Sequence, residues 1–381
     1  MPPPMPADHR PAILQVLPAL RAGGVERGTV EIAAAIAEAG YRPLVASAGG
    51  PMVAELEAVG GRHFTLGLDR KSPTALLAGT NALAEIVKTE GVRILHARSR
   101  FPAWSALMAA RRTGAHFITT YHGTYNEGFP GKRLYNSVMA RGERVIAISQ
   151  HIANVIRARH GTDATRIRVI PRGVDMARFD PALVPAARVE ALRAAWGVPS
   201  GRPVLLLPGR VTRWKGQGVL LQALATLPRP RPFVLLVGDE GRGTYAQELR
   251  TQITALGLGE DVAMPGHCDD LPAALLLADI VLHCSTDAEA FGRTIVEAQA
   301  MQRPVIASDL GAPRETVLEG ETGWRVPPGD PAALAAAIAR VLALTAEERT
   351  RIGAQGRAMV LEQYTTRAMQ QATLSVYREV L

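Results

Sequence analysis

The sequence predicts an α/β protein built from two doubly wound domains, each a parallel sheet with helices on both faces. The chain has 381 residues, which is more than one hydrophobic core usually serves. Short apolar segments rich in Val, Ile and Leu alternate with longer, alanine-rich amphipathic segments, a pattern typical of parallel sheets. This alternation stops at a stretch rich in Pro and Gly, residues 180–202, and then starts again.

The first half of the chain is expected to form one of these domains, residues 1–182, followed by a linker at 183–202. Its strands are predicted at residues 13–17, 43–46, 62–66, 94–97, 117–121, 145–148 and 168–170. Its helices are predicted at residues 25–39, 74–89, 104–112 and 151–159.

The second half is expected to form the other domain, residues 203–364. Its strands are predicted at residues 204–207, 233–237, 262–264, 280–283 and 305–307. Its helices are predicted at residues 216–226, 245–255, 271–277, 293–301 and 332–344. Helical sequence continues to the end of the chain with a break near residues 364–366, which sets off a last helix at 365–381.

The amino-acid composition limits the cellular location and the kinds of partner that are expected. No apolar run reaches the roughly 18 residues of a membrane-spanning helix, and the proline-rich start does not resemble a signal peptide. Two cysteines make neither a disulfide framework nor a metal cluster, so a cytoplasmic location is expected. Residues 1–182 carry 23 Lys and Arg against 14 Asp and Glu. That excess favours an anionic membrane or a phosphorylated acceptor, or reflects composition alone; no nucleic-acid-binding motif is present.

The strongest local signal follows the predicted strand at 280–283. Residues 289–297 have the sequence Glu-Ala-Phe-Gly-Arg-Thr-Ile-Val-Glu, in which Gly292 and Arg293 would open a helix. The free N–H groups and the dipole of a helix start attract phosphate. Glu289 before the helix and Glu297 inside it could accept hydrogen bonds from sugar and ribose hydroxyls. A solvated acidic pair at an ordinary helix start is the plain alternative.

A second signal follows the strand at 204–207, where residues 208–216 have the sequence Pro-Gly-Arg-Val-Thr-Arg-Trp-Lys-Gly. Arg210 and Lys215 would leave the carboxyl end of a strand, the edge at which open α/β sheets bind ligands. Two cations there could stabilise the charge that a nucleoside diphosphate gains as it leaves a sugar. Basic loop residues are more often merely solvated, so this segment is informative only together with the first.

Taken together with the segments 237–241 (Val-Gly-Asp-Glu-Gly), 311–315 (Gly-Ala-Pro-Arg-Glu) and 321–323 (Glu-Thr-Gly), these motifs resemble the donor half of retaining glycosyltransferase family 4 along residues 203–345. The resemblance implies the GT-B fold, in which two Rossmann-like domains face a central cleft. It places Arg210 and Lys215 on the diphosphate, Glu289 on the transferred sugar and Glu297 on the ribose. Further donor-binding positions that it implies are Gly238, Phe291, Gly292, Arg293 and Thr294.

The first half is similar to the same family through shorter motifs. Residues 20–26 (Leu-Arg-Ala-Gly-Gly-Val-Glu) contain the glycine pair Gly23 and Gly24, which the resemblance places beside donor phosphate and acceptor. The third glycine of a dinucleotide fingerprint is missing. His122 in residues 119–123 (Thr-Thr-Tyr-His-Gly) matches a histidine over the donor sugar, and Ser149 matches a helix cap. Gly123 stands where many relatives carry aspartate.

The expected activity is transfer of a hexose-type sugar from a UDP- or GDP-sugar to a saccharide or lipid-linked acceptor, with retention of configuration and without a metal or other cofactor. The resemblance favours a front-face displacement in lipopolysaccharide or polysaccharide biosynthesis, at the inner face of the membrane. Two alternatives stay open at this point. One is a sugar-nucleotide epimerase with the same two-domain fold, and the other is a non-catalytic subunit that binds nucleotide-sugars.

Overall fold

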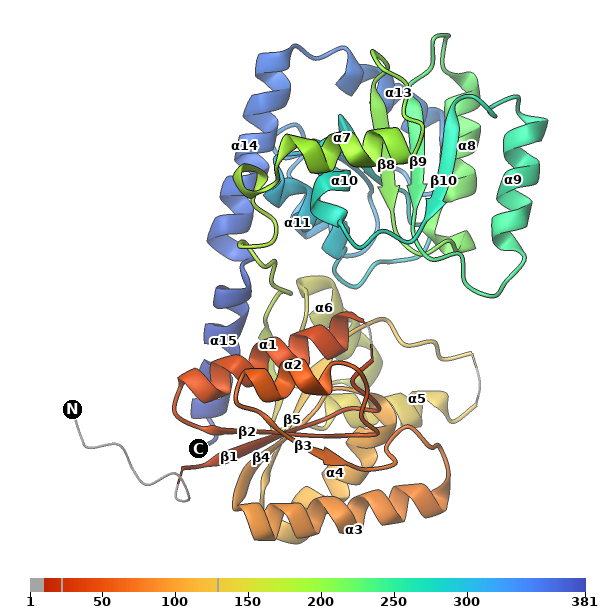
Figure 1. Ribbon diagram of the computed structural model, residues 1–381. Helices are drawn as coiled ribbons and strands as arrows, with labels where there is room; N and C mark the ends of the chain where they lie inside the picture. The colour runs from red at the N-terminus through yellow and green to blue at the C-terminus, as the bar shows by residue number, and fades with distance from the viewer. Residues whose placement is uncertain (1–9, 22, 129) are drawn as a thin grey trace. The chain divides into compact units, whose positions relative to one another are not determined.

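The computed structural model describes residues 10–21, 23–128 and 130–381. The chain divides into two compact units (Figure 1). The first comprises Met1–Arg172 together with Thr366–Leu381, and the second comprises Gly173–Thr365. Each unit is built around its own parallel sheet.

The sheet of the first unit has the strand order β3-β2-β1-β4-β5-β6-β7, with all described pairs parallel. Its strands are β1 (Ala12–Val16), β2 (Arg42–Ser47), β3 (Arg62–Thr65), β4 (Val92–Ala97), β5 (His116–Tyr121), β6 (Arg144–Ala147) and β7 (Ile167–Val169). The order reverses between β1 and β4, which makes the carboxyl ends of these strands a topological switch point. Open α/β sheets bind ligands at such points.

Helices cover both faces of this sheet. They are α1 (Gly24–Glu38), α2 (Val53–Ala58), α3 (Pro73–Glu90), α4 (Arg100–Thr113), α5 (Lys132–Asn136) and α6 (Gln150–His160). Figure 1 shows α1 and α2 on one face and α3 and α4 on the other. The Ser149 hydroxyl accepts a hydrogen bond from the Ile152 N–H at 3.1 Å, so the predicted cap of α6 is confirmed.

The last helix, α15 (Thr366–Arg378), belongs to the first unit and lies beside α1 (Figure 1). Its apolar face includes Met369 and Tyr377, which join a core cluster with Ile13 and Ile94 of the sheet. The Tyr377 hydroxyl lies 2.7 Å from Nδ1 of the buried His96. The contact between Tyr377 and His96 therefore attaches α15 to β4 in addition to the apolar packing.

The sheet of the second unit repeats the topology, with the order β10-β9-β8-β11-β12-β13 and parallel pairing. Its strands are β8 (Val204–Pro208), β9 (Phe233–Val237), β10 (Val262–Gly266), β11 (Ile280–His283), β12 (Val305–Ser308) and β13 (Trp324–Val326). The strand order reverses between β8 and β11. The carboxyl ends of these two strands carry the segments that the sequence singled out.

The helices of the second unit are α7 (Ala186–Ala195), α8 (Gln217–Thr226), α9 (Tyr245–Ala255), α10 (Leu271–Leu277), α11 (Arg293–Ala300), α12 (Pro313–Thr316), α13 (Pro331–Leu342) and α14 (Ala346–Gln363). Figure 1 shows α8 and α9 on one side of the sheet and α10 and α11 on the other. Strand β13 and helices α2, α5, α7 and α12 have no counterpart among the predicted elements. The strand and three of these helices have six residues or fewer, whereas α7 has 10 residues and lies within the stretch read as a linker.

The boundary between the units differs from the expected one. It falls at Arg172 and Gly173 instead of residue 182, and residues 183–202 form part of the second unit instead of a free linker. Within that stretch, α7 packs against α10, and Arg188 Nε donates to Asp270 Oδ2 at 2.8 Å. Val198 is buried as well. Pro and Gly predicted local turns correctly, but they carry no information about tertiary packing.

Candidate active site

The loop after β8 is held close to the end of β9 by two glycines. The Gly209 N–H donates to the Val237 carbonyl at 2.8 Å. A Cβ added to Gly238 would lie 2.0 Å from the Gly209 carbonyl oxygen, so only glycine fits at that position. The predicted donor position Gly238 therefore has a clear structural task, which is to let the two loops meet.

The same loop turns back toward β11. Gly216 has φ +75°, and a Cβ there would lie 1.9 Å from the Cys284 carbonyl oxygen. The Thr286 N–H donates to the Trp214 carbonyl at 2.8 Å, which joins the two loops by their backbones. This contact fixes the position of Lys215, which lies between Trp214 and Gly216.

Lys215 and Glu289 meet as a half-buried ion pair. Lys215 Nζ lies 2.7 Å from Glu289 Oε2, and the side chains are 16% and 18% exposed. His283 Nε2 lies 3.2 Å from the same oxygen. Burial alone raises the pKa of Glu289, but the hydrogen bond from His283 and the Lys215 ammonium outweigh burial and lower the pKa to about 2. Glu289 is therefore an ionised acceptor at neutral pH.

The backbone of Glu289 is fixed as well. The Ala312 N–H donates to the Glu289 carbonyl at 3.0 Å, and Glu289 forms a parallel bridge with Gly311. A Cβ at Gly311 would lie 2.5 Å from the Glu289 carbonyl oxygen. The glycine of the Gly-Ala-Pro-Arg-Glu motif thus lets the loop after β12 lie directly against the Glu289 loop.

Helix α11 begins at the end of this loop without a side-chain cap. Its N-cap is Gly292 in the left-handed region at φ +78°, and no side chain accepts a hydrogen bond there. The first N–H groups of a helix, here those of Arg293 and Thr294, have no intrahelical acceptor. Together with the helix dipole they form a place for an anion.

The side chains of two further predicted donor positions, Glu297 and Phe291, contact other residues of the second unit. Glu297 is 5% exposed, and its Oε1 lies 3.2 Å from Arg293 Nε one turn earlier in α11. The Phe291 ring is buried and packs edge-on against Tyr364 with centroids 5.9 Å apart. Only the backbone of Phe291 is therefore available to a ligand, whereas its side chain anchors the loop.

Arg210 takes no part in the ion pairs of Glu289 and Glu297 just described. Its backbone carbonyl accepts a hydrogen bond from Gln217 Nε2 at 3.0 Å, and Gln217 is buried. The residue is exposed. Since its backbone is fixed by a buried side chain, the loop holds Arg210 at the same strand end as Lys215 while its guanidinium stays accessible.

In the first unit, the glycine pair starts α1. Gly23 is the N-cap with φ +152°, and a side chain of Arg172 donates to the Gly24 carbonyl. The preceding residue of the motif, Ala22, lies outside the described residues. Because Arg172 is only 6% exposed, its charge is held beside the start of α1.

His122 follows β5 and is the only predicted transfer residue of the first unit. Its Nε2 is shielded from solvent and finds no hydrogen-bond partner within the described part of the chain. Burial, with the guanidinium groups of Arg98 and Arg172, lowers the pKa of His122 well below its ordinary value. A neutral ring with an unsatisfied, shielded nitrogen is suited to a hydroxyl of a ligand.

Sequence reasoning missed three charged or titratable residues of these sites. His283 was assigned no role, yet it shares Glu289 with Lys215. Arg98 and Arg172 are buried beside His122, and Arg98 Nη1 donates to Gln15 Oε1 at 3.1 Å. The available signal was position, since His283 ends β11 and Arg98 directly follows β4, both at carboxyl ends of strands.

Two parallel-sheet units with this topology, one of them with an uncapped helix start beside a Lys–Glu ion pair, have the architecture of the GT-B fold of glycosyltransferases. Family models match both halves: "Glycosyltransferase Family 4" over residues 22–178 and "Glycosyl transferases group 1" over residues 188–359. A D-inositol 3-phosphate glycosyltransferase of Xylanimonas cellulosilytica is 30% identical, covering 88% of this chain and 87% of that protein. The chain belongs to glycosyltransferase family 4.

Solved structures agree with this assignment. The crystal structure of a glycosyltransferase from Rickettsia africae is 36% identical, covers 98% of this chain and 99% of its own, and superposes with a TM-score of 0.90. Anabaena HepE in complex with UDP-glucose is 27% identical, covers 97% and 99%, and has a TM-score of 0.83. A transferase is thus supported over an epimerase or a non-catalytic binding subunit.

Proposed function

We propose that this glycosyltransferase moves a hexose-type sugar from a UDP- or GDP-sugar to a hydroxyl of a saccharide or lipid-linked acceptor, with retention of configuration. The observation that carries the proposal is the Lys215–Glu289 pair at 2.7 Å beside the uncapped start of α11. The arrangement offers cations and N–H donors for a diphosphate next to an ionised acceptor for sugar hydroxyls. The HepE complex with UDP-glucose supports a UDP-linked donor.

In this proposal the protein acts mainly on the departing diphosphate. Arg210, Lys215 and the first N–H groups of α11 stabilise the negative charge that develops as the glycosidic bond breaks. The leaving phosphate takes the proton of the attacking acceptor hydroxyl on the same face of the sugar, so the configuration is kept. No residue of the chain is required as a covalent nucleophile.

The remaining residues hold the donor in place. Glu289, kept ionised by Lys215 and His283, accepts hydrogen bonds from hydroxyls of the transferred sugar, and Glu297 accepts them from the ribose. His122 is proposed to help hold the transferred sugar, as the family resemblance implies. Gly23 and Gly24 leave room for the backbone of α1 to approach phosphate and acceptor.

The experiment that tests this function is a thermal-shift screen of the purified protein with a panel of nucleotide-sugars, followed by transfer assays with the donor that stabilises most. A ligand that binds the native state raises its stability according to affinity. Stabilisation by one UDP- or GDP-sugar, together with slow hydrolysis of that donor, supports a transferase. Interconversion of sugar-nucleotide isomers without an acceptor would instead establish an epimerase.

Donor transfer is proposed to need no metal, because two cations and a helix start already serve the diphosphate and no Asp-x-Asp motif occurs in the sequence. Turnover in excess EDTA is expected to equal turnover without it. Loss of transfer in EDTA that Mg²⁺ or Mn²⁺ restores would show that the phosphate site has been assigned wrongly. The control is donor binding measured in the same buffers, which separates metal-dependent binding from metal-dependent chemistry.

For the acceptor, we propose a saccharide or lipid-linked intermediate of lipopolysaccharide or polysaccharide assembly. The name of the Xylanimonas relative favours a second candidate, an inositol phosphate. Transfer assays with saccharide, lipid-linked and inositol phosphate acceptors in parallel would decide between them, since each product has a distinct mass.

Action at the cytoplasmic face of the membrane completes the proposal. No helix in the described part of the chain is long and apolar enough to cross a bilayer. The proposed contact is peripheral and electrostatic, through the basic first unit.

A further inference from the structure

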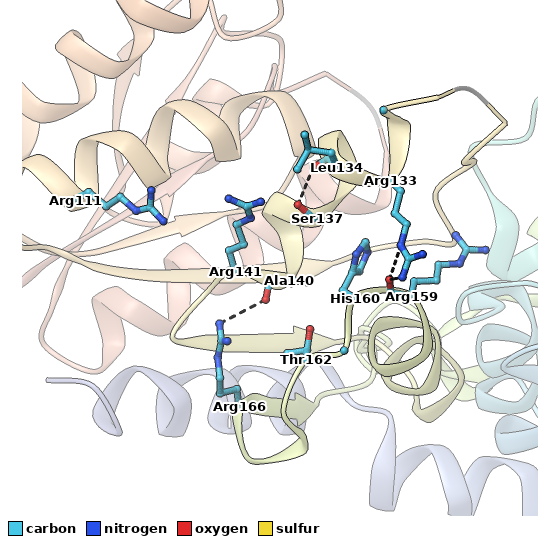
Figure 2. Close-up of a pocket in the computed structure, with 12 residues that line it drawn as sticks. Arg111, Arg133, Leu134, Ser137, Ala140, Arg141, Arg159, His160, Thr162 and Arg166 are labelled. Atoms are coloured by element: carbon cyan, nitrogen blue, oxygen red, sulfur yellow. Dashed lines mark hydrogen bonds between the residues drawn. The ribbon is translucent and has the colours of Figure 1, made fainter.

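A wide basic pocket lies in the first unit, among the ends of α4, α5 and α6 (Figure 2). It has a volume of about 790 Å³. The charged and titratable residues of its lining are Arg111, Arg133, Arg141, Arg159, Arg166 and His160. The lining, as the structure describes it, contains no Asp or Glu. None of the predicted donor or acceptor positions lines it.

The arginines are held in place largely without being neutralised. Arg133 Nε donates to the Arg159 carbonyl at 2.8 Å, and Arg159 Nη1 donates to the Tyr125 carbonyl at 2.6 Å. Arg166 donates to the carbonyls of Ala140 and Gly142. Carbonyl oxygens orient a guanidinium but carry no net charge, so this part of the pocket stays strongly positive.

Figure 2 shows Arg111 and Arg141 on the side of the pocket opposite Arg133 and Arg159, with His160 between the two pairs. Arg141 lies over the Trp104 ring at 5.0 Å, a contact that also leaves its charge intact. Among the ion pairs of the described chain, a single carboxylate reaches these arginines, namely Glu127 at 3.9 Å from Arg159.

Helix ends explain only part of this charge. Arg111 and Arg159 lie in the last turns of α4 and α6, where cations are favourable. Each helix end contributes roughly half a negative charge. Two such ends offset about one of five positive charges, and Arg141 and Arg166 lie outside α-helices altogether. The pocket therefore lacks a negative partner of its own.

We propose that this pocket binds a phosphorylated ligand carrying more than one phosphate charge. Guanidinium groups bind phosphate oxygens bidentately, and several of them converging from different elements match a polyanion better than a single carboxylate. The volume exceeds that of one phosphate group, so the ligand is a diphosphate, a bisphosphate or a phosphate borne on a larger body. A soluble metabolite and a lipid headgroup share this chemistry.

The test uses a variant that removes charge with little damage to the fold. Within the described part of the chain, the side chains of Arg111 and Arg141 make no hydrogen bond, so Arg111→Gln/Arg141→Gln is the pocket variant. The matched control is Arg93→Gln/Arg112→Gln, which removes two exposed charges of the same unit that do not line the pocket. Thermal unfolding of both variants verifies that they fold.

Binding is measured on the full chain in two arms. In the first, inorganic pyrophosphate is titrated calorimetrically in the presence of saturating UDP, which occupies a donor site. In the second, co-sedimentation compares vesicles of phosphatidylcholine with and without phosphatidic acid. We expect binding in at least one arm that weakens about tenfold or more in the pocket variant and clearly less in the control, whose loss measures the diffuse attraction between exposed cations and an anionic surface.

The arm in which this dependence occurs identifies the source as a soluble phosphate or a lipid headgroup. No binding in either arm, equal binding by the pocket variant and the wild type, or an equal loss in the pocket variant and the control would overturn the proposal. Sugar transfer is measured separately, so a failed donor assignment cannot be mistaken for a failure of this pocket.

Discussion

A carboxylate that accepts hydroxyl hydrogen bonds has to stay ionised even where it is shielded from water. Glu289 meets this requirement because Lys215 and His283 both contact its Oε2. The same ammonium also lies where a diphosphate is proposed to leave. Lys215 is thus expected to act on both sides of the breaking bond, holding the sugar-binding carboxylate ionised and stabilising the leaving group.

The first prediction is that Lys215→Ala lowers kcat/KM about 10² to 10³-fold, since a group that stabilises transition-state charge contributes roughly 3 to 4 kcal/mol. The free energy of unfolding is expected to fall by less than this, because His283 remains to contact Glu289 after the ion pair is lost. Steady-state transfer kinetics and a melting curve check the two halves of this statement.

The matched control for that change is Arg213→Ala. Arg213 lies in the same loop, but its side chain is 70% exposed and pairs with Glu248 at 2.6 Å instead of Glu289. Because Arg213 contacts Glu248 and not Glu289, the control is expected to keep wild-type turnover, and loss of an exposed pair costs little stability. Equal activity in Lys215→Ala and the control would remove Lys215 from the proposed chemistry.

At the scale of residues, the sequence predicted that Lys215 and Glu289 would belong to one site, but not that His283 would also contact Glu289. Lys215 and Glu289 are 74 positions apart, and their contact at 2.7 Å lies in the unit to which the motifs were assigned. His283 could not be predicted to join them, because a lone histidine at a strand end is compatible with many structural roles. The Phe291 ring turned inward to Tyr364, since a large aromatic side chain gains more from burial than from a polar ligand.

At the scale of elements, glycines decide how closely the loops at the strand ends approach. Gly216 combines a left-handed backbone with a position 1.9 Å from the Cys284 carbonyl when a Cβ is added. Gly257, after α9, has a similar φ of +63° but nothing within 4 Å of such a Cβ. Substitutions at these two glycines therefore separate the cost of backbone strain from the cost of disturbing the loop contact.

We predict that Gly257→Ala costs about 1 kcal/mol of unfolding free energy, the usual cost of a left-handed non-glycine residue. Gly216→Ala is expected to cost at least about 2 kcal/mol more, because β11 or the Lys215 loop has to move. Denaturant unfolding of the two variants measures the difference. Equal destabilisation would mean that the loop contact at Gly216 is easily relaxed.

Helix α15 presents a different kind of attachment, through a buried histidine. His96 lies 2.7 Å from the Tyr377 hydroxyl and 2.7 Å from the Thr120 hydroxyl. Burial and the nearby Arg98 lower the pKa of His96 well below its ordinary value. The native ring is therefore neutral where the unfolded ring would take up a proton.

This gives a pH prediction with a definite sign. The stability that the neutral His96 contributes is fully present above about pH 6.5 and declines as the pH falls below it, by at most about 1.4 kcal/mol per pH unit. Denaturant unfolding at pH 7.5 and 5.5 is expected to show a smaller pH effect in His96→Gln than in the wild type. Equal slopes in His96→Gln and the wild type would contradict the role of His96.

Over the whole molecule, the alternation of strand and helix predicted nearly every long element and the parallel class of both sheets. Apart from α7, the elements that it missed are short, such as β13 with three residues, whose pairing with β12 depends on tertiary contacts. Residues 183–202 were read as a linker because local composition does not report that α7 packs on α10. The prediction that the last helix returns to the first unit came from the family resemblance, because hydrophobic periodicity does not show which unit a helix packs on.

The net charge is divided unevenly between the two units. The first unit, Met1–Arg172 with Thr366–Leu381, contains 24 Lys and Arg against 13 Asp and Glu, whereas the whole chain has a net charge of +8. The second unit is therefore slightly acidic. Near an anionic bilayer each exposed cation contributes about 1 kcal/mol, and the attraction falls off within a Debye length of roughly 8 Å at physiological salt.

The last prediction is that the full chain binds vesicles containing phosphatidylglycerol but not vesicles of phosphatidylcholine alone, and that high salt releases it. Lys132→Gln/Arg133→Gln is expected to weaken this binding several-fold, since two charges at the start of α5 are lost. Arg229→Gln/Arg242→Gln removes two exposed charges from the second unit instead and should bind as the wild type does. Co-sedimentation at low and high salt measures all three proteins. Equal binding to both lipids, or none to either, would assign the basic charge of the first unit to composition, because a diffuse electrostatic contact has to distinguish anionic from neutral surfaces.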